Sequence, residues 1–395
     1  MIKRKKKNKE HNPFYDPTLK KRHLSAKRFK KFTLTSLIFS VAFLAFFLFD
    51  MIGKGIPAFN IAYIKVDVTF NEKTLEDTRF AVPTEYRNLV SRAALRDLQK
   101  LLEENPTYMN STQNIWILAS SQVDQYIKNH NHNLKDKDIA KVDELYAQGL
   151  IDKKFNAIFF ENGDSKIPEY AGIFSAVIGS ILTLIITMAV AFPIGVMTAI
   201  YLEEFAGDNK FTRFIEININ NLAAIPSILF GLLGLAIFIN LFGMPRSSPL
   251  VGGLTLALMT LPIIIVSSRA ALRAVPDSIR QAGYGLGLNK IQVTRDHVLP
   301  LAFPGIMTGS IIGLAQAMGE TAPLIIIGMI AFIPDAPSMV TQAATVMPAQ
   351  LFTWAGMPEG MYIEKTAAGI LVLLTILISL NAIAIYLRKK LEVKW

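Results

Sequence analysis

Residues 171–200 read AGIFSAVIGSILTLIITMAVAFPIGVMTAI, with no charged side chain. A helix crosses the hydrocarbon core of a bilayer with roughly 20 apolar residues, so this stretch is long enough to span a membrane. Together with it, we expect six spanning helices, at about 32–53, 171–200, 219–243, 249–268, 302–332 and 366–387. The sequence therefore predicts an all-α polytopic membrane protein with six transmembrane helices.

The composition agrees with a membrane protein. Hydrophobic residues make up 51% of the chain and charged residues 18%, against roughly a quarter charged in soluble proteins. The net charge is +10, and Lys and Arg crowd the first 31 residues. Because long apolar runs follow, we expect the anionic membrane lipid, and not nucleic acid, as the neighbour of this basic segment. The absence of cysteine excludes disulfides, thiol chemistry and cysteine-based zinc sites.

The first 54 residues predict a basic cytoplasmic tail (1–31) followed by an uncleaved signal anchor (32–54). The basic leader is longer than a secretory signal usually has. After Phe49 the sequence continues Asp50-Met51-Ile52, and no small-x-small cleavage site is present.

The distribution of Lys and Arg predicts the orientation. Basic residues concentrate in three segments: the N-terminal tail, the loop from Arg269 to Arg295 and the tail from Arg388 to Lys394. With six spans these segments fall on one side, and the positive-inside rule assigns that side to the cytoplasm. The segments at 244–248 and 333–365 then face outward. We expect a protein of the bacterial cytoplasmic (inner) membrane with both termini in the cytoplasm.

Residues 55–170 are polar and predict a small α+β domain inserted on the extracytoplasmic side. Apolar residues alternate with polar ones at the period of a half-buried strand, at Ala62, Ile64, Val66, Val68 and Phe70. Between Pro83 and Pro106, apolar residues recur at intervals of three or four and predict a helix: Tyr86, Val90, Ala94, Leu98 and Leu101. Phe155 to Phe160 suggests another strand.

Motifs for catalysis and metal binding are missing. His130 and His132 lie in a polar segment without matched ligands, which favours a solvated loop over a metal site. The glycines between Gly283 and Lys290 match neither nucleotide-binding pattern, and no H-E-x-x-H or G-x-S-x-G occurs. We therefore expect no enzyme, no cofactor and no metal. If ATP drives this protein, other subunits must hydrolyse it.

The loop between the fourth and fifth expected spans carries a longer pattern. It reads QAGYGLGLNK over 281–290 and HVLP over 297–300. This order closely resembles the "EAA" loop of ABC importer permeases, in which a glycine and a terminal Leu-Pro follow at fixed spacing. Gln281 stands where that family usually has Glu, and Gly283 replaces its second Ala.

The resemblance implies an ATPase-docking surface at 281–300. Gly287 permits a sharp reversal of the chain. The residues from Lys290 to His297 are expected to form a short helix that offers Ile291, Val293 and Thr294 to a groove on a partner. The simpler alternative is an ordinary basic loop. The residues assigned to docking are Gln281, Ala282, Gly283, Gly287, Ile291, Leu299 and Pro300.

Three further segments resemble phosphate importer permeases of the PstA type: AIPSILFGL at 224–232, SSRAALRAVP at 267–276 and GETAPL at 319–324. The resemblance covers about 171–390, which it implies is a five-helix permease core. The basic tail and the inserted domain resemble the extended subgroup of that family. Gln316 stands where the family often has Arg. Val266 and Arg269 stand where it often has Arg and Glu.

Five residues are candidates for the substrate pathway: Glu320, Gln316, Arg269, Arg273 and Ser227. Glu320 lies within an expected span, where a lone carboxylate costs at least ~2.5 kcal/mol, so either a pathway role or a structural ion pair that locks two helices would explain it. We expect its partner to be Arg269 or Arg273 of this chain, or an arginine of a second permease. Pro323 should kink that helix. Arg269 and Arg273 share a helix face and could bind an anion or simply set orientation. Gln316 and Ser227 are neutral hydrogen-bonding groups, and Ser227 could equally serve helix packing.

The function implied by the resemblance is a transmembrane permease subunit that forms half of the pore of an ATP-driven phosphate importer. The implied partners are two ABC ATPase subunits, a second and related permease, a soluble phosphate-binding protein, phosphate and membrane lipid. One alternative keeps the fold and changes the substrate to another oxyanion, such as sulfate or molybdate. A different class is a membrane-anchored sensor that uses the outer domain, although a sensor needs no docking loop. A membrane-embedded hydrolase is disfavoured by the absent catalytic motifs.

Overall fold

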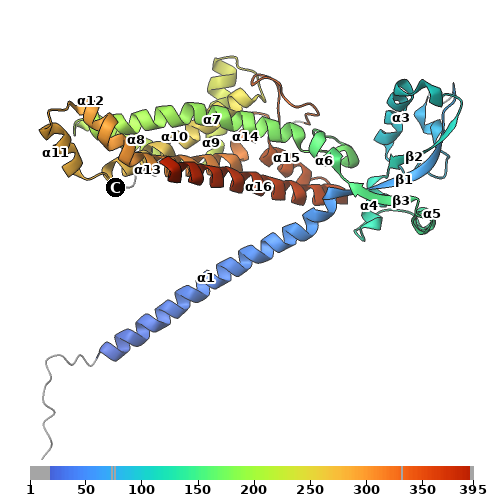
Figure 1. Cartoon of the computed structure of the whole chain (residues 1–395), viewed down its shortest axis with the longest axis horizontal. Helices are drawn as coiled ribbons and strands as arrows, with labels where there is room; N and C mark the ends of the chain where they lie inside the picture. Colours follow the sequence, from blue (N-terminus) through green and yellow to red (C-terminus); the bar gives the residue numbers. More distant parts are fainter. Residues whose placement is uncertain (1–17, 73, 75–76, 331, 392–395) are drawn as a thin grey trace, which may run out of the picture. The chain divides into compact units, whose positions relative to one another are not determined.

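The computed structural model describes residues 18–72, 74, 77–330 and 332–391 (Figure 1). The chain divides into two compact units, residues 1–53 and 54–395. Within the second unit we distinguish a sheet region (residues 56–170) and a helical core (residues 171–391). The sheet region lies at one end of the long core helices, and the hairpin of α11 and α12 lies at the other (Figure 1).

The first unit consists, in its described part, of one long helix. α1 runs over Leu19–Gly55 and contains the predicted span at 32–53. The expected boundary at residue 31 does not interrupt this helix, because Lys and Arg are good helix formers and continue it beyond the apolar segment. Most of the predicted basic tail, residues 1–17, lies outside the described residues.

A three-stranded antiparallel sheet forms the centre of the sheet region. β1 (Asn60–Thr69) lies between β2 (Thr112–Leu118) and β3 (Ile151–Phe155). The alternation that predicted the first strand is confirmed, since one set of side chains is fully buried: Ala62, Ile64, Val66, Val68 and Phe70.

The helices of the sheet region are α3 (Arg92–Glu104), α4 (Ser121–Ile127), α5 (Asp136–Ala147) and α6 (Ala157–Glu161). The helix predicted from Tyr86 begins later, because Ser91 caps α3 by accepting a hydrogen bond from the Ala93 amide. The strand predicted at Phe155–Phe160 is wrong beyond Phe155. The Asn156 side chain accepts from the amide of Phe159 at 3.2 Å and starts α6 there.

Buried polar contacts join the sheet region to the start of α16 (Gly360–Leu391). The Lys365 ammonium donates to the carbonyls of Pro168 and Ala171, each at 2.6 Å. The Glu364 carboxylate accepts from Gln125 Nε2 at 2.7 Å, forms an ion pair with Lys128 Nζ at 3.1 Å and contacts the ring of His130. His130 thus belongs to this junction and is not simply a solvated loop residue.

Long helices build the core: α7 (Phe174–Ile200), α10 (Pro249–Arg273), α13 (Leu299–Gly319) and α16. The shorter ones are α8 (Lys210–Ala223), α9 (Ser227–Gly234), α11 (Asp277–Gly285), α12 (Lys290–Val293), α14 (Ala322–Ile326) and α15 (Met347–Ala355). Small residues bring α13 against α10, because a Cβ at Gly305 would lie 2.6 Å from Ala271 Cβ. A Cβ at Gly309 would collide with Ser267.

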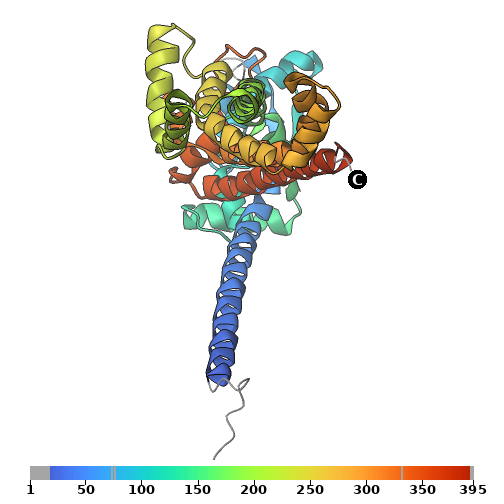
Figure 2. The same cartoon turned by 90° about the vertical axis from the view of Figure 1, so that its left-hand side faces the viewer.

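Five described helices are long and apolar enough to cross a membrane, or six if one bent pair counts as a span. That pair is α8 with α9, which meet at 103°, so the predicted straight span at 219–243 is wrong. Figure 2 shows part of this yellow segment standing across the direction of α16 (red). Pro226, at the N-cap of α9, explains the break, because proline disfavours helical geometry in the residue before it. The span predicted at 302–332 is also interrupted, after Gly319.

Introduced cysteines can test the orientation that the charges predict, because the native chain has none. Lys137 on α5 and Ser278 on α11 are both exposed. In intact cells we expect Lys137→Cys to react with an impermeant maleimide. Ser278→Cys should react only after permeabilisation, and the cysteine-free parent should stay unlabelled. The opposite labelling pattern would reverse the predicted topology.

Candidate docking site and pathway residues

The α11–α12 hairpin (residues 277–293) reverses the chain between α10 and α13. Gly287 has φ +82°, a left-handed conformation that side chains other than glycine adopt with strain. Asn289 then starts α12 through a capping box, in which its side chain accepts from the Gln292 amide at 2.9 Å and Gln292 accepts from the Asn289 amide at 2.9 Å. The expected reversal at Gly287 is thus present.

The short helix predicted after the turn is not a separate element. α12 continues through a π-helical turn (Thr294–Val298) into α13, so one helical stretch runs over Lys290–Gly319. Of the residues expected to face a partner, Ile291 is exposed, whereas Val293 and Thr294 are buried. Val293 packs under α11, where a Cβ on Gly283 would approach its Cγ2 to 2.8 Å. This contact explains why glycine stands where the related loops have alanine.

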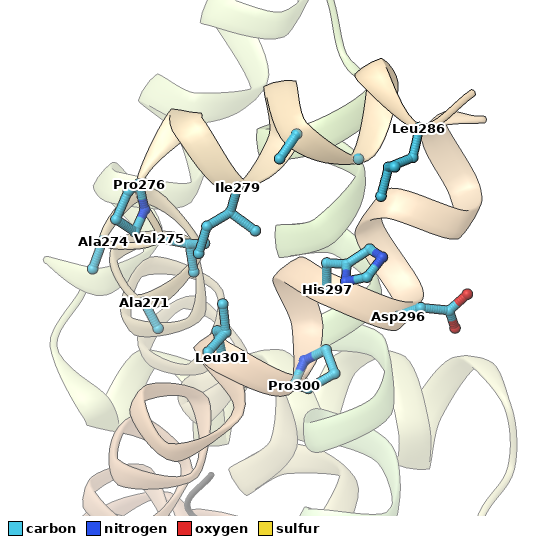
Figure 3. A pocket seen from close by; sticks show the side chains of 12 residues that line it. Ala271, Ala274, Val275, Pro276, Ile279, Leu286, Asp296, His297, Pro300 and Leu301 are labelled. Carbon is cyan, nitrogen blue, oxygen red and sulfur yellow. The ribbon is translucent and has the colours of Figure 1, made fainter. Parts of the chain in front are cut away.

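The hairpin presents apolar side chains and a cavity on its surface. Leu286 is 80% exposed and Ile291 64% exposed. A cavity of about 770 Å³ opens between α11 and the start of α13, with Ile279 and Leu286 on one wall and Pro300 and Leu301 on the other (Figure 3). An exposed apolar surface beside a cavity is typical of a protein-binding site.

The structure gathers the seven residues assigned to docking at this end of the core. Ala282, Gly283 and Pro300 line the cavity. Gln281, Gly287 and Ile291 are exposed, and Leu299 is half-buried. Their role in docking stays a prediction.

A buried ion pair, which the sequence analysis missed, anchors the hairpin to the π-helical turn (Tyr201–Phe205) that continues the end of α7. The guanidinium of Arg280 on α11 lies 2.6 Å from Glu204 Oε1 and also donates to the carbonyls of Val275 at 2.7 Å and Leu272 at 3.0 Å. Only 4% of the Glu204 side chain is exposed. Removing one partner of such a pair costs about 3–5 kcal/mol, because the other charge stays buried. The adjacent glutamates at 203–204, opposite several arginines, were the signal for this pair in the sequence.

Arg269 and Arg273 bind carboxylates of their own chain. Arg269 Nε lies 3.3 Å from Glu203 Oε2, and its Nη2 lies 2.5 Å from Glu216 Oε1. Arg273 Nε lies 2.7 Å from Glu203 Oε1. The shared face predicted for these arginines is confirmed by their common partner. The hypothesis that either pairs with Glu320 within this chain is wrong in this structure, since other carboxylates occupy both.

Glu320 lies at a helix break and not inside a continuous helix. α13 ends at Gly319, Glu320 is extended (φ −78°, ψ 126°), and α14 begins at Ala322. Pro323 therefore does not kink a helix: it lies in the first turn of α14, where its missing N–H has no helical partner to lose. The Glu320 side chain is half-buried and forms no salt bridge within the described residues.

The neutral candidates lie on neighbouring helices. Ser227 is the first residue of α9, and α9 packs closely on α14, since a Cβ on Gly231 would lie 2.7 Å from Pro323 Cα. Gln316 is exposed on α13. Within the described residues no hydrogen bond links Ser227, Gln316 and Glu320, so their place in a pathway stays a prediction.

Two glycines of the hairpin provide a matched test of the turn. A Cβ at either Gly285 or Gly287 would meet nothing within 4 Å, but only Gly287 has a positive φ. We expect Gly287→Ala to lower the apparent melting temperature of the purified chain, by a strain of about 1–2 kcal/mol, and to weaken pull-down of the ATPase. Gly285→Ala should do neither. Equal behaviour of the two variants would show that the left-handed turn is not needed.

Two family models match parts of this chain. The family model described as "Binding-protein-dependent transport system inner membrane component" matches residues 191–393, about half of the chain. A second model, a domain of unknown function (DUF3333), matches residues 16–85 and 81–136.

Among curated proteins, the phosphate transport system permease protein PstA of Mycobacterium leprae is 36% identical over 160 residues, which are 40% of this chain and 52% of that protein. PstA of Yersinia pestis is 30% identical over 245 residues, 61% of this chain and 81% of that protein. This chain thus spans about half the length of the first of these relatives. A solved inward-facing MetNI methionine ABC transporter aligns with TM-score 0.43 and 14% identity, over 56% of this chain and 94% of that one. The family match and the Yersinia relative show that the chain belongs to the binding-protein-dependent transport system inner membrane components.

Proposed function

We propose that this chain is the permease subunit of an ATP-driven phosphate importer in the bacterial cytoplasmic membrane. Two ABC ATPases dock on the α11–α12 hairpins of a permease pair, and the second permease completes the pore. The observation that carries this proposal is the hairpin itself, with Leu286 and Ile291 exposed beside a cavity on a turn fixed by Gly287.

The assignment of phosphate rests on the relatives. The Mycobacterium leprae and Yersinia pestis proteins are both named phosphate transport system permeases. Another oxyanion such as sulfate or molybdate is the alternative that keeps the same fold. A membrane sensor is disfavoured, because a sensor has no need of a surface for ATPase docking.

The ion pairs at this end of the core suggest how ATP drives transport. Movement of an ATPase displaces the hairpin, and Arg280 transmits that displacement to Glu204 at the end of α7. Glu203 connects the same end of α7 to α10 through Arg269 and Arg273. The hairpin, α7 and α10 therefore move together, and the cavity between the permeases alternates between inward-facing and outward-facing states.

In the importing direction, a soluble phosphate-binding protein delivers phosphate on the side of the sheet region. At the break around Glu320 the regular helical hydrogen-bonding pattern stops, which frees backbone groups for other partners. Such breaks line transport pathways in other membrane proteins. A carboxylate repels phosphate, so Glu320 acts indirectly. It positions a cation contributed by the partner permease and weakens the grip of that cation on phosphate.

Glu320→Gln tests this role, because it preserves shape and removes the charge. In cells that lack other phosphate importers and express the complete transporter, we expect the variant to lose at least tenfold in radiolabelled phosphate uptake, with insertion and ATPase association unchanged. Asp335→Asn, at an exposed carboxylate in the segment after α14, is the matched control and should transport normally.

Wild-type uptake in Glu320→Gln would contradict the pathway role, and loss of assembly would indicate a structural ion pair instead. Competition by unlabelled oxyanions identifies the substrate. If sulfate or molybdate suppresses uptake better than phosphate does, the phosphate assignment is wrong.

A further inference from the structure

A second cavity, also of about 770 Å³, lies in the sheet region and shares no lining residue with the hairpin cavity. Its walls come from the start of α3, the start of α4, the segment before α5, residues 166–169 and Glu359, which directly precedes α16. Groups from the sheet region and from the helical core therefore meet around one space.

The lining of this cavity is basic in a region that is otherwise acidic. Residues 55–170 contain 14 basic and 17 acidic residues, a net charge of −3. Five of those basic residues line the one cavity: Arg87, Arg92, Arg96, Lys135 and Lys166. The acidic residues of the lining are Asp138, Glu169 and Glu359.

The opposing carboxylates do not neutralise this charge. Within the described residues none of the five basic side chains forms an ion pair. Arg87 donates to the Val82 carbonyl at 3.1 Å, and Lys166 lies 5.6 Å from the ring centroid of Phe332. Glu169 is buried and accepts from the Ser121 amide. Burial raises the pKa of its carboxyl, which favours the uncharged form.

Arg92 and Arg96 are both exposed at the start of α3. They are spaced i,i+4 on the first turns of α3, and no acidic residue lies in its first turn. Like charges at this spacing repel, and the positive end of the helix dipole adds to the repulsion. A bound anion would remove both penalties, and guanidinium groups bind phosphate through paired hydrogen bonds.

Glu359, which is half-buried, completes the lining on the side of α16. With five basic and three acidic side chains, the lining as a whole favours an anion.

We propose that this cavity binds a phosphate group at Arg92 and Arg96 of α3. The site is distinct from the transport pathway of the proposed function. The cavity lies between the sheet region and the start of α16, so a bound anion would contact both parts. The sheet region could thereby respond to phosphate on the side from which the binding protein delivers it. The phosphate group comes from free inorganic phosphate or from the headgroup of a phospholipid.

The test is isothermal titration calorimetry, which measures binding of inorganic phosphate to the full chain. The chain is purified with its assembled subunits in nanodiscs of phosphatidylcholine, a lipid without net charge. We expect saturable binding that Arg92→Ala/Arg96→Ala weakens at least tenfold. Lys137→Ala/Lys153→Ala is the matched control, since both lysines are exposed on the sheet region outside the cavity. Glu320→Gln should retain this binding even where it loses uptake, which separates this site from the transport pathway.

In nanodiscs with phosphatidylglycerol, unchanged phosphate binding identifies free phosphate as the ligand. Competition by the lipid that disappears in Arg92→Ala/Arg96→Ala identifies the headgroup. Phosphate binding that is absent in wild type in both lipids, or unaffected by the double substitution, would overturn the proposal, whatever the outcome of the uptake assay.

Discussion

The buried ion pair between Arg280 and Glu204 is the constraint on which the arrangement of the core end depends. Glu204 is almost fully enclosed, so its charge is tolerated only because Arg280 compensates it. The same guanidinium satisfies the carbonyls of Leu272 and Val275 at the end of α10. One side chain therefore fixes α11 against both α7 and α10. In the proposed function, this ion pair would transmit a displacement of the hairpin to α7 and α10, whereas a flexible hinge at the same place would absorb it.

A comparable device operates at the opposite end of the core. Lys365 donates hydrogen bonds to backbone carbonyls of residues 168–171. The Glu364 carboxylate contacts the side chains of Gln125, Lys128 and His130. Both residues lie in the first turns of α16, so these contacts join the sheet region directly to a regular helix and not to a loop. The sheet region is thus attached to a core helix through buried polar groups, and the basic cavity lies beside this attachment. An anion bound there would act on a junction that is already rigid.

Features set by local apolar patterning could be predicted from the sequence. β1 was predicted because its alternation is uninterrupted, and α10 because its apolar run is long. The docking residues were assigned from the resemblance of 281–300 to the EAA loop, and the reversal expected at Gly287 is present. At Phe155–Phe160 a strand was predicted from the aromatic residues, and the capping potential of Asn156 was overlooked. Its side chain accepts a hydrogen bond from the Phe159 amide, which favours a helix.

Other features depend on partners that are distant in the sequence. The bend at Pro226 and the break at Glu320 interrupt stretches whose hydropathy alone suggests straight spans. Arg269 and Arg273 were two of the candidate partners of Glu320, but in the structure Glu203 pairs with both and Glu216 pairs with Arg269. The basic cavity could not be predicted from the sequence for the same reason. Its five basic residues are separated by up to 79 positions, and only the fold brings them together.

The central claim is that the hairpin is fixed to the core through Arg280 and Glu204, and a double-mutant cycle on the apparent melting temperature tests it most directly. The cycle compares the purified wild type with Arg280→Gln, Glu204→Gln and the double variant, with Arg213→Gln as the control at an exposed pair. The account predicts that Arg280→Gln destabilises strongly, because it leaves a buried carboxylate unpaired, and that adding Glu204→Gln recovers much of the loss. Arg213→Gln should change little, because the Arg213–Asp208 pair is solvent-exposed. Additive effects of the two core substitutions would contradict the account.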